Sequence, residues 1–134
     1  TSSLVGSEMC IRDRKIPLQC TSGGKLILAY HSREWVDSYL NYNPLKQYTN
    51  NTIIHKETLH RELELIRQQG YSLDNREHNP DIVCIAAPIF GIDGNLAGTI
   101  GISAPDYRFS PEKACSFAEE VKRSAAAITE KLQA

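Results

Sequence analysis

Two long stretches of the chain place apolar residues at helical spacing. Leu59, Leu63 and Ile66 fall at i, i+4 and i+7, and Gly70 follows as a C-terminal stop. The second stretch opens with Ser110 as an N-cap and a proline at the first helical position. We expect a helix that ends near residue 70 and one long helix from residue 111 onwards. The apolar stripe of the long helix consists of Ala114, Phe117, Ala118, Val121, Ala125, Ile128 and Leu132.

Two shorter helices are expected earlier in the chain. Thr21 or Ser22 can cap a helix that carries Leu26 and Leu28, and Ser32 can cap the next one. Residues 17–20 are predicted to be extended, because a proline disfavours helical geometry in the residue before it.

The strand signals lie between the two long helices. Residues 71–76 are typical of a short strand, and residues 82–90 form a nearly unbroken apolar run. A turn over residues 91–95, with Asp93-Gly94 at its centre, leads into a returning strand over residues 96–103. The order of three helices, strands and a final helix predicts an α+β domain with an antiparallel sheet.

Side-chain alternation divides the predicted hairpin into two different faces. In the first strand, Ile82, Cys84 and Ala86 share a face. In the returning strand, the small and partly polar residues share one face, which holds Ala97, Thr99, Gly101 and Ser103. If these faces align, they form a shallow surface of small residues that leaves space for a ligand and offers it hydroxyl groups. The alternative is that small residues merely let a helix pack closely, and spacing alone favours that alternative.

Composition and charge exclude several classes of protein. The chain has 134 residues, of which 41% are hydrophobic and 23% charged, which is typical of one globular domain. The formal charge is −1 and no basic stripe is visible, so this segment is a poor match for a nucleic-acid surface. No apolar run approaches the roughly 20 residues that cross a membrane.

The four cysteines show no paired spacing, so we expect reduced thiols in a cytoplasmic protein. The four histidines form no metal-binding pattern, and neither a metal nor a cofactor is expected. Cys84 could be a nucleophile, but its apolar flanks favour a small buried residue. Asp74 precedes the apolar strand, and a lone acid in such a place is usually solvated.

The turn Ser22-Gly23-Gly24 offers backbone N–H groups at a helix start, which can hold a carboxylate. An ordinary capped helix is the alternative, and the local sequence by itself favours it. Residues 1–14 show no clean periodicity, and we expect them to be a tag, a fusion scar or otherwise foreign to the domain over residues 15–134.

Several segments, taken in order, resemble the effector-binding domain of the IclR family of bacterial transcription regulators. The resemblance covers roughly Lys15 to Leu132, and only the ordered set is specific. The matching segments are Pro17-Leu18-Gln19-Cys20-Thr21-Ser22-Gly23-Gly24-Lys25, Thr49 with Thr52-Ile53, Leu63 with Ile66-Arg67, Gly70-Tyr71-Ser72, Asp74 with Glu77, Cys84-Ile85-Ala86-Ala87-Pro88-Ile89-Phe90, Asp93-Gly94, Ser103 with Pro105, and Arg108-Phe109.

The resemblance implies a GAF-like fold with a central antiparallel sheet and helices packed on it. It also implies a pocket beside the sheet for a small carboxylate, such as a 2-oxo acid or a sugar acid. In that pocket the turn Ser22-Gly23-Gly24 would meet the carboxylate, and Asp74 and Cys84 would contact polar groups of the ligand. Ile82 would form an apolar wall, with Gly101 and Ser103 on the neighbouring strand. These implied positions agree with the face of small residues predicted from alternation. We therefore prefer a ligand site to the two alternatives, which are close helix packing on that face and an ordinary capped helix.

The family places a winged helix-turn-helix DNA-binding domain upstream, and this sequence shows none, so we expect a chain truncated at its N-terminus. The resemblance favours a sensing domain, in a dimer or tetramer, that performs no catalysis. Two other interpretations stay open: a GAF-like redox enzyme that uses Cys84, and a structural dimerisation module with an empty pocket.

Overall fold

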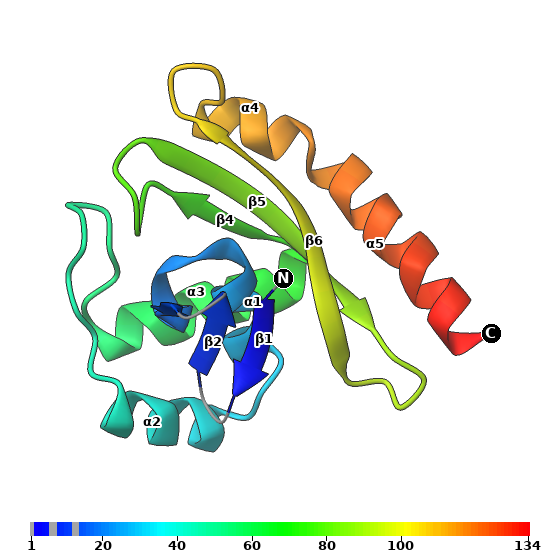
Figure 1. Cartoon of the computed structure of the whole chain (residues 1–134), viewed down its shortest axis with the longest axis horizontal. Coiled ribbons are helices and arrows are strands. Elements are labelled where there is room, and N and C mark those ends of the chain that lie inside the picture. Colours follow the sequence, from blue (N-terminus) through cyan, green and yellow to red (C-terminus); the bar gives the residue numbers. More distant parts are fainter. Residues whose placement is uncertain (1, 6–7, 12–13) are drawn as a thin grey trace.

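A three-stranded antiparallel sheet forms the centre of the computed structural model, which describes residues 2–5, 8–11 and 14–134, with side chains from Ile16 onwards (Figure 1). Strand β5 (Ile82–Phe90) lies between β4 (Ser72–Asn75) and β6 (Leu96–Pro105). The turn between β5 and β6 requires a positive φ of 79° at Gly94, which glycine adopts without strain. The predicted hairpin and the α+β fold are therefore confirmed.

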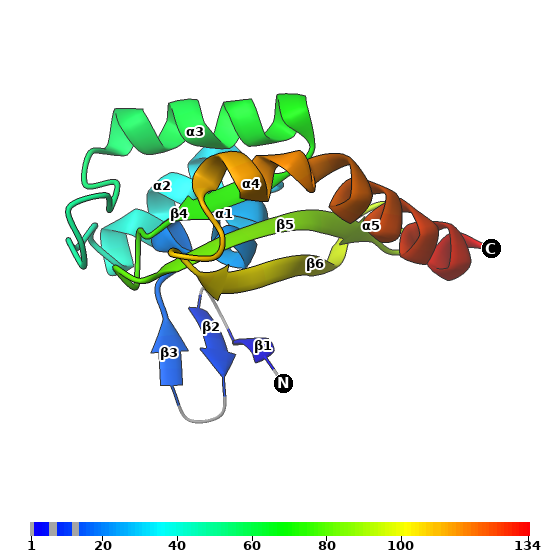
Figure 2. The ribbon, with the colours of Figure 1, turned by 90° about the horizontal axis from the view of Figure 1, so that it is seen from above.

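Helices cover both faces of this sheet (Figures 1 and 2). Helices α4 (Pro111–Ser116) and α5 (Ala118–Gln133) pack on one face, where Val83, Ile85 and Ala87 are fully buried. Helix α1 (Ser22–Ala29) lies on the opposite face, backed by α2 (Arg33–Tyr42) and α3 (Lys56–Gln69). The sheet thus separates two apolar clusters, since residues of alternating direction along β5 contribute to different sides.

The helix ends follow the capping residues that the sequence predicts. The hydroxyl oxygens of Thr21, Ser32 and Ser110 accept hydrogen bonds from backbone N–H groups three residues later, at 3.0, 3.1 and 3.1 Å. Gly70 ends α3 in the left-handed region with φ 82°.

Three local predictions were wrong. Residues Leu18–Cys20 form a 3-10 helix, η1, rather than an extended segment, and the N–H of Leu18 donates to the hydroxyl of buried Tyr39 at 3.2 Å. The long C-terminal helix is broken at Phe117, which leaves helical geometry with φ −93° and ψ 1°. Leu132, predicted to be buried, is 48% exposed.

The N-terminal residues form a second antiparallel sheet in the order β1 (Ser2–Val5), β2 (Glu8–Ile11) and β3 (Arg14–Ile16). The origin predicted for residues 1–14 stays a prediction. Within the described part of the chain, every helix is too short or too polar to cross a membrane.

Candidate functional site

The register of the central sheet aligns the two faces that alternation singled out. Asp74 of β4 pairs with Cys84 of β5, and Cys84 pairs with Ser103 of β6, so these three residues form one row across the sheet. The next row is Ser72, Ala86 and Gly101. Residues directly opposite one another in an antiparallel sheet point to the same face.

Cys84 and Ser103 make a direct contact within the first row. The Cys84 thiol donates to the Ser103 hydroxyl oxygen, with 3.0 Å between Sγ and Oγ. Burial raises the pKa of Cys84, and the nearby charge of Asp74 adds to this, although the hydrogen bond between Cys84 and Ser103 partly lowers the pKa. A raised pKa keeps the thiol protonated, so the structure disfavours Cys84 as a nucleophile.

The start of α1 lies over the same face of the sheet. A β-carbon placed on Gly23 would be 3.4 Å from Oγ1 of Thr99, which belongs to β6. The N–H groups in the first turn of a helix have no intrahelical acceptors. In α1 these include the N–H groups of Ser22 and Gly23. The predicted helix start and strand face are thus brought together.

The two predicted glycines beside this site mainly provide space. The N–H of Gly24 already donates to the Thr21 hydroxyl, and a β-carbon at Gly24 would overlap the carbonyl of Leu18. A β-carbon at Gly101 would overlap the carbonyl of Ile85. Both glycines therefore allow close backbone packing, and the Gly24 N–H is not a free donor.

Asp74 is the most buried polar group of the row, with 5% of its surface exposed. Its Oδ1 accepts a hydrogen bond from the backbone N–H of Glu77 at 2.8 Å. Burial raises the pKa of Asp74, and the Glu77 hydrogen bond and the charge of Lys25 offset only part of that increase. The carboxyl group is therefore held in one orientation but takes up a proton more readily than an exposed Asp.

Cys20 of η1 lies near the same carboxyl group. It is fully buried, and burial together with the charge of Asp74 raises the pKa of Cys20 to about 12. Ile82 is half-buried, lies two residues before Cys84 on the same face of β5, and pairs with Pro105 in the neighbouring row. The predicted apolar wall is therefore at the edge of the face.

A buried ion-pair network that the sequence did not predict lies beside Asp74. The ammonium group of Lys25, with no exposed side-chain surface, is 2.8 Å from Oε2 of Glu62 and 2.9 Å from Oε2 of Glu77. It also donates to the carbonyl of Leu73 at 2.6 Å. Burial by itself would lower the pKa of Lys25, but Glu77 and Glu62 raise it, so the ammonium stays charged. This network links α1, α3 and the end of β4.

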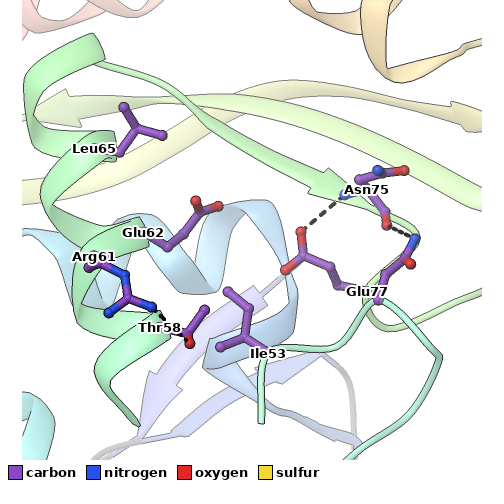
Figure 3. Close-up of a pocket in the computed structure, with 8 residues that line it drawn as sticks. Ile53, Thr58, Arg61, Glu62, Leu65, Asn75 and Glu77 are labelled. Atoms are coloured by element: carbon purple, nitrogen blue, oxygen red, sulfur yellow. Dashed lines mark hydrogen bonds between the residues drawn. The ribbon is translucent and has the colours of Figure 1, made fainter. Parts of the chain in front are cut away.

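Glu77 also borders a surface groove of about 500 Å³ (Figure 3). Glu62 and Leu65 of α3 line one side of this groove, and Asn75 and Glu77 line the other. The groove contains none of the eight residues predicted to bind ligand. Within the described residues, no cluster of three or more His, Cys, Asp or Glu side chains could hold a metal ion.

A family model described as the C-terminal domain of the bacterial transcriptional regulator IclR matches residues 11–130. The chain belongs to this family. The IclR C-terminal model begins at residue 11, inside the segment that was predicted to be foreign.

Curated relatives of this IclR-type domain are transcriptional regulators. The HTH-type regulator KdgR of Dickeya chrysanthemi is 35% identical over 119 residues, which is 89% of this chain and 39% of the relative. The HTH-type repressor AllR of Escherichia coli K12 is 31% identical over 115 residues, or 86% of this chain and 42% of the relative. The chain therefore spans about two fifths of the length of these relatives.

Solved structures give the same assignment. The crystal structure of the C-terminal domain of E. coli KdgR has a TM-score of 0.85 at 30% identity, and the match covers 99% of this chain and 85% of that one. The Thermotoga maritima IclR structure has a TM-score of 0.81 at 36% identity over 90% of this chain and 49% of that one. The predicted family and fold class are confirmed.

Proposed function

We propose that this IclR-type domain is an effector sensor that binds a small organic carboxylate, such as a 2-oxo acid or a sugar acid, and catalyses no reaction. The observation that carries the proposal is the strand register, which sets Asp74, Cys84 and Ser103 in one row on the face that the start of α1 contacts. A helix start and convergent polar side chains on one sheet face are typical of an anion-binding site.

The ligand carboxylate would be held by the N–H groups of Ser22 and Gly23, where the helix dipole favours a negative charge. The remaining oxygens of the ligand would meet Ser103, Cys84 and Asp74 across the sheet. Lys25 is nearby but bound to two glutamates, so neutral donors would hold the acid. A site of this kind suits a small acid with one carboxylate and further polar groups.

The curated relatives are named HTH-type regulators, which suggests that effector binding to this domain would control DNA binding. A DNA-binding segment outside the matched region would contact the operator, and this domain would report the effector. The effector can change DNA affinity only if it binds one arrangement of the assembled regulator better than another. We expect the whole regulator to be a cytoplasmic dimer or tetramer.

Isothermal titration calorimetry of the chain with a panel of 2-oxo and sugar acids tests this proposal. We expect at least one acid to bind, and Asp74→Ala to abolish or strongly weaken that binding. Asp81→Ala is the matched control, because Asp81 is exposed in the loop before β5. If a folded sample binds no acid in the panel, or if Asp74→Ala binds as well as the wild type, the proposal is wrong.

A further inference from the structure

The proposed effector site lies beside a group of buried charges whose balance is already negative. Lys25 supplies one positive charge, and Glu62, Glu77 and Asp74 supply three negative charges when all are ionised, which leaves a net charge of −2. The Lys25 and Glu77 side chains are 0% and 7% exposed, and Glu62 is 27% exposed. A ligand carboxylate would add a further negative charge beside Asp74, which is only 5% exposed and therefore poorly screened by water.

Of the carboxylates in this group, Asp74 has its negative charge least offset by neighbouring positive charge. Within the described residues, Lys25 forms ion pairs with Glu62 and Glu77 and none with Asp74. The hydrogen bond that Asp74 accepts comes from the backbone N–H of Glu77 and reaches Oδ1. Among the residues that the structure describes, none donates a hydrogen bond to Oδ2 of Asp74, which can therefore take a proton or contact the ligand.

None of the other described groups that face Asp74 can neutralise the negative charge that a ligand carboxylate adds. Cys20 on η1 and Cys84 on β5 are neutral thiols whose pKa values are raised by burial. Ser103 on β6 does not titrate, and Lys25 on α1 is already protonated. Burial raises the pKa of Glu77 as well, but its Oε2 accepts from the Lys25 ammonium at 2.9 Å and from the Asn75 N–H at 3.1 Å. Asp74 has no ion pair with Lys25, so we expect the proton on Asp74.

We propose that the effector binds together with one proton, which Asp74 takes from solvent, so that the Asp74 carboxyl is neutral in the complex. This inference rests on the proposed effector site. A neutral carboxyl can donate a hydrogen bond, so the effector presents an oxygen to it, as 2-oxo and 2-hydroxy acids do. The class of effector narrows to acids with a single negative charge and an oxygen next to the carboxylate.

Proton uptake is measured by calorimetry of pyruvate and glyoxylate binding in two buffers with different ionisation enthalpies, repeated over a series of pH values. We expect uptake to approach one proton per site above the pKa of Asp74 in the free domain. In that range the affinity falls about tenfold for each pH unit. Asp74→Asn keeps a neutral amide with an acceptor oxygen for the Glu77 N–H, so it should bind with no uptake and no pH dependence.

Glu77→Gln is the comparison variant, because it removes the other buried carboxylate: uptake that is lost in Asp74→Asn but still measurable in Glu77→Gln assigns the proton to Asp74. Binding by the wild type without proton uptake at every pH would overturn this inference and leave the effector site standing. Uptake that persists in Asp74→Asn, or that disappears in Glu77→Gln alone, would also overturn it. Absence of binding by both acids and by the rest of the panel would overturn the effector site itself.

Discussion

The backbone N–H of Glu77 donates to Oδ1 of Asp74 at 2.8 Å, while the side chain of the same Glu77 binds Lys25 at 2.9 Å. One residue thus joins the row of polar groups on the sheet to the buried ion pair behind it. Because Lys25 belongs to α1, the position of the helix start relative to Asp74 depends on this connection.

Replacement of Lys25 by methionine should strongly destabilise the domain. The change leaves Glu62 and Glu77 without their buried partner, and loss of one member of a buried ion pair costs about 3–5 kcal/mol. Urea denaturation measures the effect. Lys113→Met is the control, because Lys113 is exposed on α4, and it should change the free energy of unfolding by less than about 0.5 kcal/mol. An equally small loss for Lys25→Met would show that the network contributes little.

A methyl group at Gly24 should destabilise the domain, because a β-carbon there overlaps the carbonyl of Leu18 in η1. Overpacking of this kind typically costs about 1–3 kcal/mol. Gly98→Ala is the matched substitution, since a β-carbon at Gly98 meets no atom within 4 Å. Denaturation of both variants should show a loss for Gly24→Ala alone, and equal stability would contradict the close packing of η1 on α1.

Much of the fold could be predicted because its signals are local. The caps at Thr21, Ser32 and Ser110 and the stop at Gly70 each depend on residues within one turn. The break at Phe117 could not be predicted, because the apolar stripe continues through both helices without a change of period.

The candidate site was predicted in part for a similar reason. Alternation along β5 and β6 predicts which residues between Cys84 and Ser103 share a face. A register shift between Ile89 and Phe90, which leaves Ala97 out of the pairing, could not be predicted from alternation. The Lys25 network joins residues 37 and 52 positions apart, so no local pattern indicates it. The one available signal was a lysine inside an otherwise apolar helical segment.

Asp74→Asn should stabilise the ligand-free domain at neutral pH. Burial raises the pKa of Asp74 in the folded state above its ordinary value of 3.8. The stability that the protonated carboxyl contributes is complete below the unfolded pKa and is lost as the pH rises through the folded pKa. An amide cannot ionise and keeps this stability at every pH.

Denaturation of wild type and Asp74→Asn at several pH values tests this expectation. The advantage of the variant should be largest near neutral pH and shrink as the pH falls toward 3.8. Each unit of upward shift corresponds to about 1.4 kcal/mol. A variant that is less stable than the wild type at neutral pH would show that the ionised carboxylate is favourable there.

The described cysteines should react with iodoacetamide at very different rates. Cys115 is exposed and should react first, Cys84 more slowly because burial raises its pKa, and Cys20 last because it is fully buried with a pKa of about 12. Peptide mass spectrometry after timed quenching gives the three rates. Alkylation of Cys84 as fast as that of Cys115 would instead favour redox chemistry at Cys84.

The most direct test of the effector site is a crystal structure of the domain with the acid that binds most tightly in calorimetry. We expect a carboxylate within hydrogen-bond distance of the N–H groups of Ser22 and Gly23, with Asp74 and Ser103 on its other side. An acid bound in another place, such as the groove between α3 and the end of β4, would contradict it.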